Sequence, residues 1–236
     1  MSNMVEENGL VGALGEVRQK KKAGRPRGTA NQRSARHRFL EVSTELVRRN
    51  GLKQLTLGEV CRRVGVAKST FYVRFSSREE LLEAVLHEYF SSLMCDAQAA
   101  ARFLPPGVQR LARMIEVWVQ HYVLKHGGCL LLSGSVEYAG VDDDETRVII
   151  VEMVRAWRTL LASQIRDAVQ AGELLSDVDE QQMLFEIFSV VLGVQHDCRF
   201  LGEAVGFRAA MLYSIFKRHG AKLSPVMPAL LRCENG

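Results

Sequence analysis

Apolar side chains in the second half of the chain recur with the period of an α-helix. From Ile150 to Ala168 they stand at intervals of four, three, four, four and three residues. This spacing gathers them on one face of a helix, whereas a half-buried strand would alternate apolar and polar residues. The helical period runs through most of the chain after residue 33, with hardly a run of strand alternation. The sequence therefore predicts an all-α protein.

The net charge of +4 is divided unevenly along the 236 residues. Residues 18–87 hold 17 Lys and Arg against 6 Asp and Glu, whereas the remainder holds 14 against 21. A local excess of 11 positive charges indicates that the first part binds a polyanion. The remainder has an ordinary, mildly acidic surface, and the apolar share of 47% is that of a globular protein.

Several classes of protein are disfavoured by what the sequence lacks. There is no apolar run near 18 residues and no signal peptide pattern, so we expect a cytoplasmic protein without a membrane partner. The five cysteines are scattered and never form a C-x-x-C pair, which favours free thiols. His196 and Cys198 would point to different sides of a helix, so we expect no metal there. Phosphate-loop, nucleophile-elbow and H-E-x-x-H motifs are absent, so we expect neither catalysis nor a cofactor.

A basic run precedes the first expected helix. Residues 18–38 hold nine Lys and Arg and no acid, and the helix breakers Gly24, Pro26 and Gly28 prevent the run from folding alone. Residues 24–27 resemble an AT-hook, in which Arg25 and Arg27 lie in the minor groove of A·T-rich DNA. A basic run can also be a solvated tail. Here it leads directly into a second candidate for nucleic-acid contact, which favours a DNA-binding arm.

That second candidate is the stretch GVAKSTFYVRF at residues 65–75. Thr56 and Glu59 have the spacing of a capping box that opens a helix, and Gly65 ends this helix with a tight turn. In the helix that follows, Phe71 and Phe75 would point inward, as in a helix-turn-helix. A plain two-helix corner with a charged solvent face is the alternative. The polar residues left mainly outside suit the major groove, and they are Lys68, Ser69, Thr70, Tyr72 and Arg74.

The run from Leu55 to Leu86 resembles the TetR family of bacterial transcriptional regulators. Its most diagnostic part is GVAKSTFYVRF followed closely by SREEL at residues 77–81. The match covers residues 33–90, and beyond them it is architectural. The resemblance implies a disordered basic arm (1–32), a three-helix helix-turn-helix DNA-binding domain (33–80), a helical effector-binding and dimerisation domain (81–220) and a C-terminal tail (221–236).

The resemblance also implies DNA contacts for individual residues. Thr56 would cap its helix against a phosphate, Tyr72 would press its hydroxyl on the DNA backbone, and Arg74 and Arg78 would clamp phosphates. The start of the recognition helix would read base edges or adjoining phosphates through Lys68, Ser69 and Thr70. Ala67 departs from the family, in which Ser or Thr commonly caps this helix.

A recognition helix of two turns reads few base pairs, so we expect a homodimer on a palindromic operator. The apolar helix at 185–194 is either central core or dimer seam, and the resemblance favours the seam. The expected interface residues are Phe185, Phe188, Val191, Leu192, Leu212 and Phe216.

The resemblance places an effector pocket among the middle helices, although aromatic residues at helical spacing also form plain core. The candidate pocket residues are Trp118, His121, Tyr122, Glu137, Tyr138, Met153 and Trp157. The function implied is a repressor released from its operator by a small molecule. A constitutive or architectural DNA-binding protein without an effector, and a transcriptional activator, are the alternatives.

Overall fold

The computed structural model describes residues 30–125, 127–142, 144–203 and 208–221. Arg25 and Arg27 lie outside these residues, as do most of the predicted arm and almost all of the predicted tail. Every regular element in the described ranges is helical, so the all-α prediction is confirmed. Residues Arg36–Gly236 form one compact unit, separate from Met1–Ala35.

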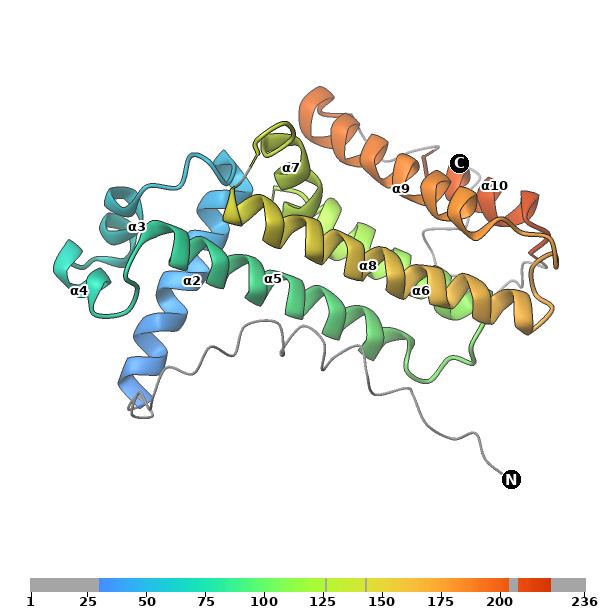
Figure 1. Ribbon diagram of the computed structural model, residues 1–236, viewed down its shortest axis with the longest axis horizontal. Helices are drawn as coiled ribbons and strands as arrows, with labels where there is room; N and C mark the ends of the chain where they lie inside the picture. The colour runs from blue at the N-terminus through green and yellow to red at the C-terminus, as the bar shows by residue number, and fades with distance from the viewer. Residues whose placement is uncertain (1–29, 126, 143, 204–207, 222–236) are drawn as a thin grey trace. The chain divides into compact units, whose positions relative to one another are not determined.

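The helices succeed one another with short connections (Figure 1). Their bounds are α2 (Ala30–Asn50), α3 (Leu57–Val64), α4 (Lys68–Tyr72), α5 (Arg78–Ala101), α6 (Val108–Val117), the π-helical η1 (Trp118–Val123), α7 (Leu130–Glu137), α8 (Glu145–Gln170), α9 (Glu180–His196), the π-helical η2 (Asp197–Leu201) and α10 (Arg208–Arg218). The predicted boundary between residues 80 and 81 falls inside α5, which continues without a break.

Helices α2, α3 and α4 form a small group, here called the head, around a cluster of three aromatic rings. Phe39, Phe71 and Phe75 are each at most 1% exposed. The Phe71 ring lies 5.7 Å from that of Phe39 and 5.4 Å from that of Phe75. Gly65 ends α3 with φ 79°, a left-handed conformation that glycine adopts without strain. The predicted helix-turn-helix corner is therefore present.

The expected start of α3 at Thr56 is also present, and α5 begins with a similar side-chain cap at Ser77. Thr56 Oγ1 accepts from the Glu59 amide at 3.4 Å, and Ser77 Oγ accepts from the Glu80 amide at 3.0 Å. The reciprocal bonds differ, because Glu80 accepts instead from the amide of Ser76 at 2.7 Å. Glu59 turns its carboxylate to arginines of its own helix. One side chain per cap therefore fixes each start.

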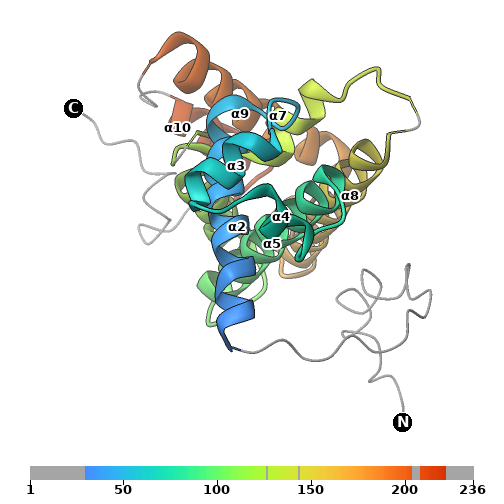
Figure 2. The same cartoon turned by 90° about the vertical axis from the view of Figure 1, so that its left-hand side faces the viewer.

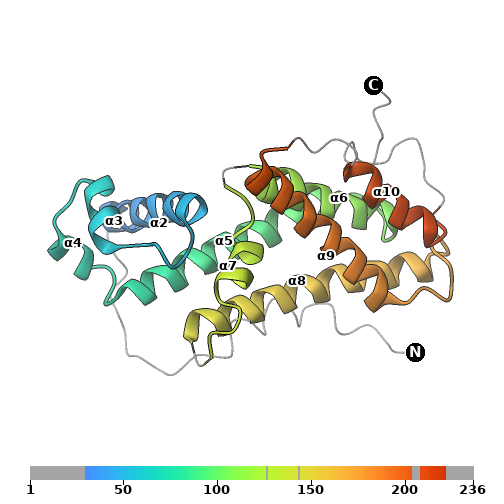
Figure 3. The same ribbon diagram turned by 90° about the horizontal axis from the view of Figure 1, so that it is seen from above.

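The remaining helices form the core domain, in which α5 runs beside α6 and α8 (Figures 1 and 3). On the other side α8 contacts α7 and α9, and α9 contacts α10. Ile150, Trp157, Leu161, Ile165 and Ala168 are buried along α8, as the spacing of these residues predicts. Within the described ranges, each helix is too short or too polar to cross a bilayer.

Candidate nucleic-acid interface

The short helix α4 packs against α3 (Figure 2 shows both helices within the head), and most of its polar side chains are exposed while its aromatic anchor Phe71 is buried. Lys68 and Ser69 are exposed, Thr70 is half-buried, and Tyr72 is 57% exposed. Because Phe71 is fully buried, α4 is fixed by one face and leaves the other to a partner. Ala67 makes no side-chain cap for the helix, as expected for alanine at this position.

The other side chains predicted to contact phosphates differ in their exposure and in their hydrogen bonds within the protomer. Thr56 is exposed at the start of α3, and Arg74 is half-buried with a buried Nε that has no hydrogen-bond partner in the described part of the chain. Arg78 instead donates from Nε to the Leu55 carbonyl at 2.6 Å and from Nη2 to the Leu52 carbonyl at 2.9 Å. Its guanidinium therefore holds the loop between α2 and α3 in the free protomer.

Two further arginines, Arg62 and Arg63, lie on α3. The sequence pattern had indicated only that they add to the positive charge of this region. Arg62 pairs with Glu59 at 2.7 Å, and its side chain is 71% exposed. Arg63 pairs with Glu59 and with Glu45 of α2, both at 3.0 Å. Hydrogen bonds from Arg62 and Arg63 hold the pKa of Glu59 below its usual value. The i, i+3 and i, i+4 spacing of Glu59 to Arg62 and Arg63 is the signal that could have revealed these two pairs, whereas Glu45 lies 18 residues from Arg63.

The seven predicted effector residues do not gather in one place. Trp118 and Trp157 lie fully buried in the core domain with ring centroids 5.5 Å apart, and Met153 is buried on the same helix as Trp157. Trp118 Nε1 donates to Cys129 Sγ at 3.5 Å. Trp157 Nε1 is buried and finds no hydrogen-bond partner within the described residues.

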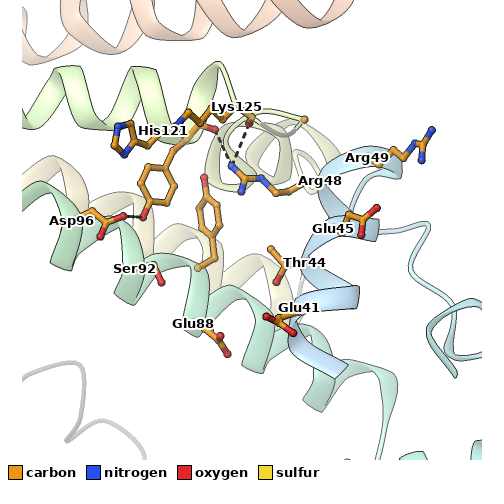
Figure 4. A pocket seen from close by; sticks show the side chains of 13 residues that line it. Glu41, Thr44, Glu45, Arg48, Arg49, Glu88, Ser92, Asp96, His121 and Lys125 are labelled. Carbon is orange, nitrogen blue, oxygen red and sulfur yellow. Dashed lines mark hydrogen bonds between the residues drawn. The ribbon is translucent and has the colours of Figure 1, made fainter. Parts of the chain in front are cut away.

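His121 and Tyr122 border an open cleft of about 910 Å³ between α2, α5 and η1 (Figure 4). The Tyr122 hydroxyl donates to Asp96 Oδ2 at 2.6 Å, and burial together with this bond raises the pKa of Tyr122. Arg48 Nη2 crosses the cleft to the carbonyls of Tyr122 and Lys125, at 3.4 Å each. The Tyr122 hydroxyl and Arg48 Nη2 are therefore already partnered within the protein, whereas the buried Arg48 Nε has no hydrogen-bond partner among the described residues.

Glu137 and Tyr138 lie at a third place, against the loop between α2 and α3. The Glu137 carboxylate accepts from the amides of Leu52 at 3.1 Å and Lys53 at 2.9 Å, and the Lys53 ammonium lies 5.0 Å from the Tyr138 ring centroid. Glu137 is thus engaged with the head and is not available to an effector among the middle helices. Spacing along one helix cannot reveal a partner 85 residues away.

The predicted dimer residues separate into two groups. Phe185 is 65% and Leu192 45% exposed on α9, while Phe188 is half-buried with its ring 4.9 Å from that of Trp118. The other three are core residues and not surface, because they are at most 1% exposed within the protomer: Val191, Leu212 and Phe216. Met211 of α10, which the sequence analysis missed, is 49% exposed beside the groove between α9 and α10.

In the described part of the chain, no three His, Cys, Asp or Glu side chains cluster as metal ligands would. The geometry that remains is a helical head with an exposed polar helix, joined to a helical core domain. This arrangement fits recognition of an extended polyanion.

Comparison with known proteins gives matches in both parts. Residues 39–85 match the model for bacterial regulatory proteins of the tetR family, and residues 107–213 match that for the tetracyclin repressor-like C-terminal domain. The transcriptional regulator AcuR of Cereibacter sphaeroides is 26% identical over 167 residues, 69% of this chain and 75% of AcuR.

Solved structures share the fold. A TetR-family regulator from Agrobacterium tumefaciens has a TM-score of 0.71 and 17% identity, and the match covers 81% of this chain and 100% of the Agrobacterium chain. FadR of Bacillus subtilis, solved in complex with stearoyl-CoA, has a TM-score of 0.60 and 16% identity, covering 80% of this chain and 99% of FadR.

Proposed function

Because the chain belongs to the TetR family of transcriptional regulators, whose members bind DNA and are not enzymes, we propose that it is a repressor. It binds a palindromic operator as a homodimer in the cytoplasm, and a small-molecule effector releases it. The observation that carries this proposal is the exposed polar side of α4 opposite the buried Phe71. A rigid helix with donors on its free face is what the major groove admits.

The head would contact the operator in two ways. Lys68, Ser69 and Thr70 at the start of α4 read base edges or the adjoining phosphates, while Tyr72 and Thr56 bond the DNA backbone. Arg25 and Arg27 of the arm would add minor-groove contacts next to the site. Two heads about 34 Å apart then read two half-sites on one side of the duplex.

An effector site in the core domain is supported by a buried donor that has no hydrogen-bond partner among the described residues, beside aromatic rings. Buried N–H groups almost always have a partner, which leaves Trp157 Nε1 as a donor that a ligand acceptor can satisfy. Trp118 and Phe188 supply the apolar surroundings. A panel of small molecules that leaves operator affinity unchanged would favour the constitutive or architectural alternative, since release requires differential binding to two states.

Sequencing the genomic fragments retained by the purified protein tests the proposal directly. We expect an inverted repeat shared by those fragments, with its position relative to promoters separating repression from activation. A monomeric protein that attaches equally weakly to every duplex would contradict the proposal.

Lys68→Ala is expected to weaken binding to all duplexes by a similar factor. For the wild-type dimer, six to eight neutralised phosphates give a log–log salt slope of about −5 to −7. Removing Lys68 from both protomers should reduce the magnitude of this slope by about 2. Anisotropy titrations over a salt series measure it. Lys217→Ala, which removes an exposed charge on α10, is the control and should leave the slope unchanged. An unchanged slope in the Lys68 variant would place this side chain away from the phosphates.

Thr70→Ala is expected to relax sequence preference at one base pair per half-site by about 1–3 kcal/mol. The reason is that a hydroxyl that reads a base edge contributes to discrimination more than to affinity. Selection from randomised operators measures the preference at every position. Thr70→Val, which keeps the shape of the side chain, should relax the same position. A valine variant with wild-type preference would mean that the hydroxyl does not read a base.

A further inference from the structure

The loop between α2 and α3 is held by side chains from other parts of the compact unit. Leu52 and Leu55 anchor the loop by burial, at 0% and 3% exposure. The backbone amides and carbonyls of the loop hydrogen-bond to the side chains of Glu137 and Arg78. Glu137, the last residue of α7, accepts the Leu52 amide with Oε1 at 3.1 Å and the Lys53 amide with Oε2 at 2.9 Å. Two bonds to one carboxylate fix both the position and the rotation of the loop.

The carbonyl side of the same loop is held by Arg78, the first residue of α5. Its guanidinium donates to the carbonyls of Leu52 at 2.9 Å, Lys53 at 3.2 Å and Leu55 at 2.6 Å. Although Arg78 belongs to α5, it lies only three residues after Phe75 of the head's aromatic cluster, so its bonds join the loop to a segment next to the head along the chain. Glu137 differs, because it reaches the loop from α7, which follows the head by more than 50 residues.

Other core-domain contacts meet the head at the end of α2. Arg199 of η2 donates to the Arg48 carbonyl at 3.1 Å, and Arg48 Nη2 reaches the carbonyls of Tyr122 and Lys125 at the end of η1 (Figure 4). Gly127 packs so closely here that a Cβ would collide with the Arg48 carbonyl. The Arg48 bonds to Tyr122 and Lys125 are long, and Arg199 makes one bond to a neutral carbonyl, whereas Glu137 makes two bonds of ordinary length with a charged acceptor.

We propose that Glu137 is a positioning residue for operator recognition, which fixes the head against the core domain and so sets the separation between the two recognition helices of a dimer. This inference rests on the proposed function. The loop that Glu137 holds lies directly between α2 and α3, so a change in its orientation turns the helix-turn-helix relative to the dimer partner. We therefore expect Glu137 to govern how strongly affinity depends on the spacing between half-sites, and not which bases are preferred within each half-site.

The dependence of operator affinity on half-site spacing tests the proposal, because a residue that only stabilised the fold would leave this dependence unchanged. Each base pair added between half-sites moves them apart by about 3.4 Å and rotates them by about 35°. For the wild-type protein we expect one added or removed base pair to lower affinity about tenfold or more, because the DNA or the dimer must deform. For Glu137→Ala we expect this penalty to fall to about threefold or less, since the freed heads adapt to each spacing.

The experiment combines that spacing series with amide hydrogen exchange in the free protein. Glu137→Ala should speed exchange at Leu52 and Lys53 about tenfold or more, and it should flatten the spacing profile. Glu137→Gln keeps one carbonyl acceptor, so both readouts should fall between alanine and wild type. Glu152→Ala removes an exposed carboxylate of α8 and is the matched control, with both readouts as in wild type.

Each result decides between distinct conclusions. A Glu137→Ala protein with faster exchange but the wild-type spacing profile would overturn the proposal, because the bonds would hold the loop without positioning the head. Unchanged exchange would overturn it as well, since the bonds would then fix nothing. Wild-type protein that binds no duplex specifically at any spacing would instead refute the proposed function, and this inference with it, before any variant is measured.

Discussion

The double variant Phe185→Asp, Leu192→Asp is expected to be monomeric and to lose about 100- to 10,000-fold in operator affinity. Both side chains are exposed apolar groups on α9 in the protomer, 65% and 45% exposed. A two-fold interface would bury each of them twice, and full burial of such a side chain contributes about 1.5–3 kcal/mol. Replacing them with carboxylates removes this gain and opposes like charges across the axis. Without a partner, each head must bind its half-site alone and loses the effective concentration that linkage supplies.

The exposed side of α9 has the shape that close helix packing needs. Ser189 lies between the two bulky residues along α9 and Gly193 directly follows Leu192; both are small and exposed, and a Cβ at Gly193 would meet open space. Met211 of α10 continues the apolar surface across the groove between the two helices. Large side chains alternating with small ones allow two copies of this face to interlock.

Sedimentation velocity measures the oligomeric state of the double variant, and operator titration measures its affinity for the operator. Phe103→Asp is the control, because Phe103 is 86% exposed in the turn after α5, away from α9 and α10. This variant should remain dimeric with wild-type affinity. A Phe185, Leu192 double variant that stays dimeric would place the interface on another surface.

The sequence predicted best what depends on neighbours along the chain. The period of α8, the start of α3 at Thr56 and the turn at Gly65 are all local patterns, and the structure has each of them. Phe71 and Phe75 were placed inward by the same reasoning and are buried. Local physics decides these features, since helix faces, caps and turns involve residues at most a few positions apart.

The contacts that the sequence did not reveal join distant elements of the chain. Helix α9 is apolar nearly all round, so its sequence alone cannot say which side packs inward; Val191, expected at the dimer interface, is buried within the protomer. Glu137 and Arg78 are polar residues near expected sites, but their partners lie 85 and 26 residues away at the most. Both side chains hydrogen-bond to backbone groups of the irregular loop between α2 and α3, Glu137 to its amides and Arg78 to its carbonyls. Only the tertiary arrangement shows such a loop.

Phe71→Ala is expected to destabilise the head by about 3–5 kcal/mol, enough to abolish specific operator binding. Helix α4 spans only Lys68–Tyr72, and a helix of five residues has no stability of its own. Its fully buried anchor is Phe71, which stacks on Phe75 and meets Phe39 edge to face. Removing this ring leaves a cavity among the other two and frees the recognition helix from the head.

The loss should be local, and this separates it from general unfolding. Amide exchange across α3 and α4 is expected to approach that of an open chain, while buried amides of α8 keep their protection because Trp157 and Leu161 pack elsewhere. Phe71→Leu should restore part of the stability and binding, since it refills most of the volume. Val73→Ala, at a side chain 71% exposed just after α4, should change neither measurement. Wild-type exchange and affinity in the alanine variant would mean that something other than the aromatic cluster holds α4 in place.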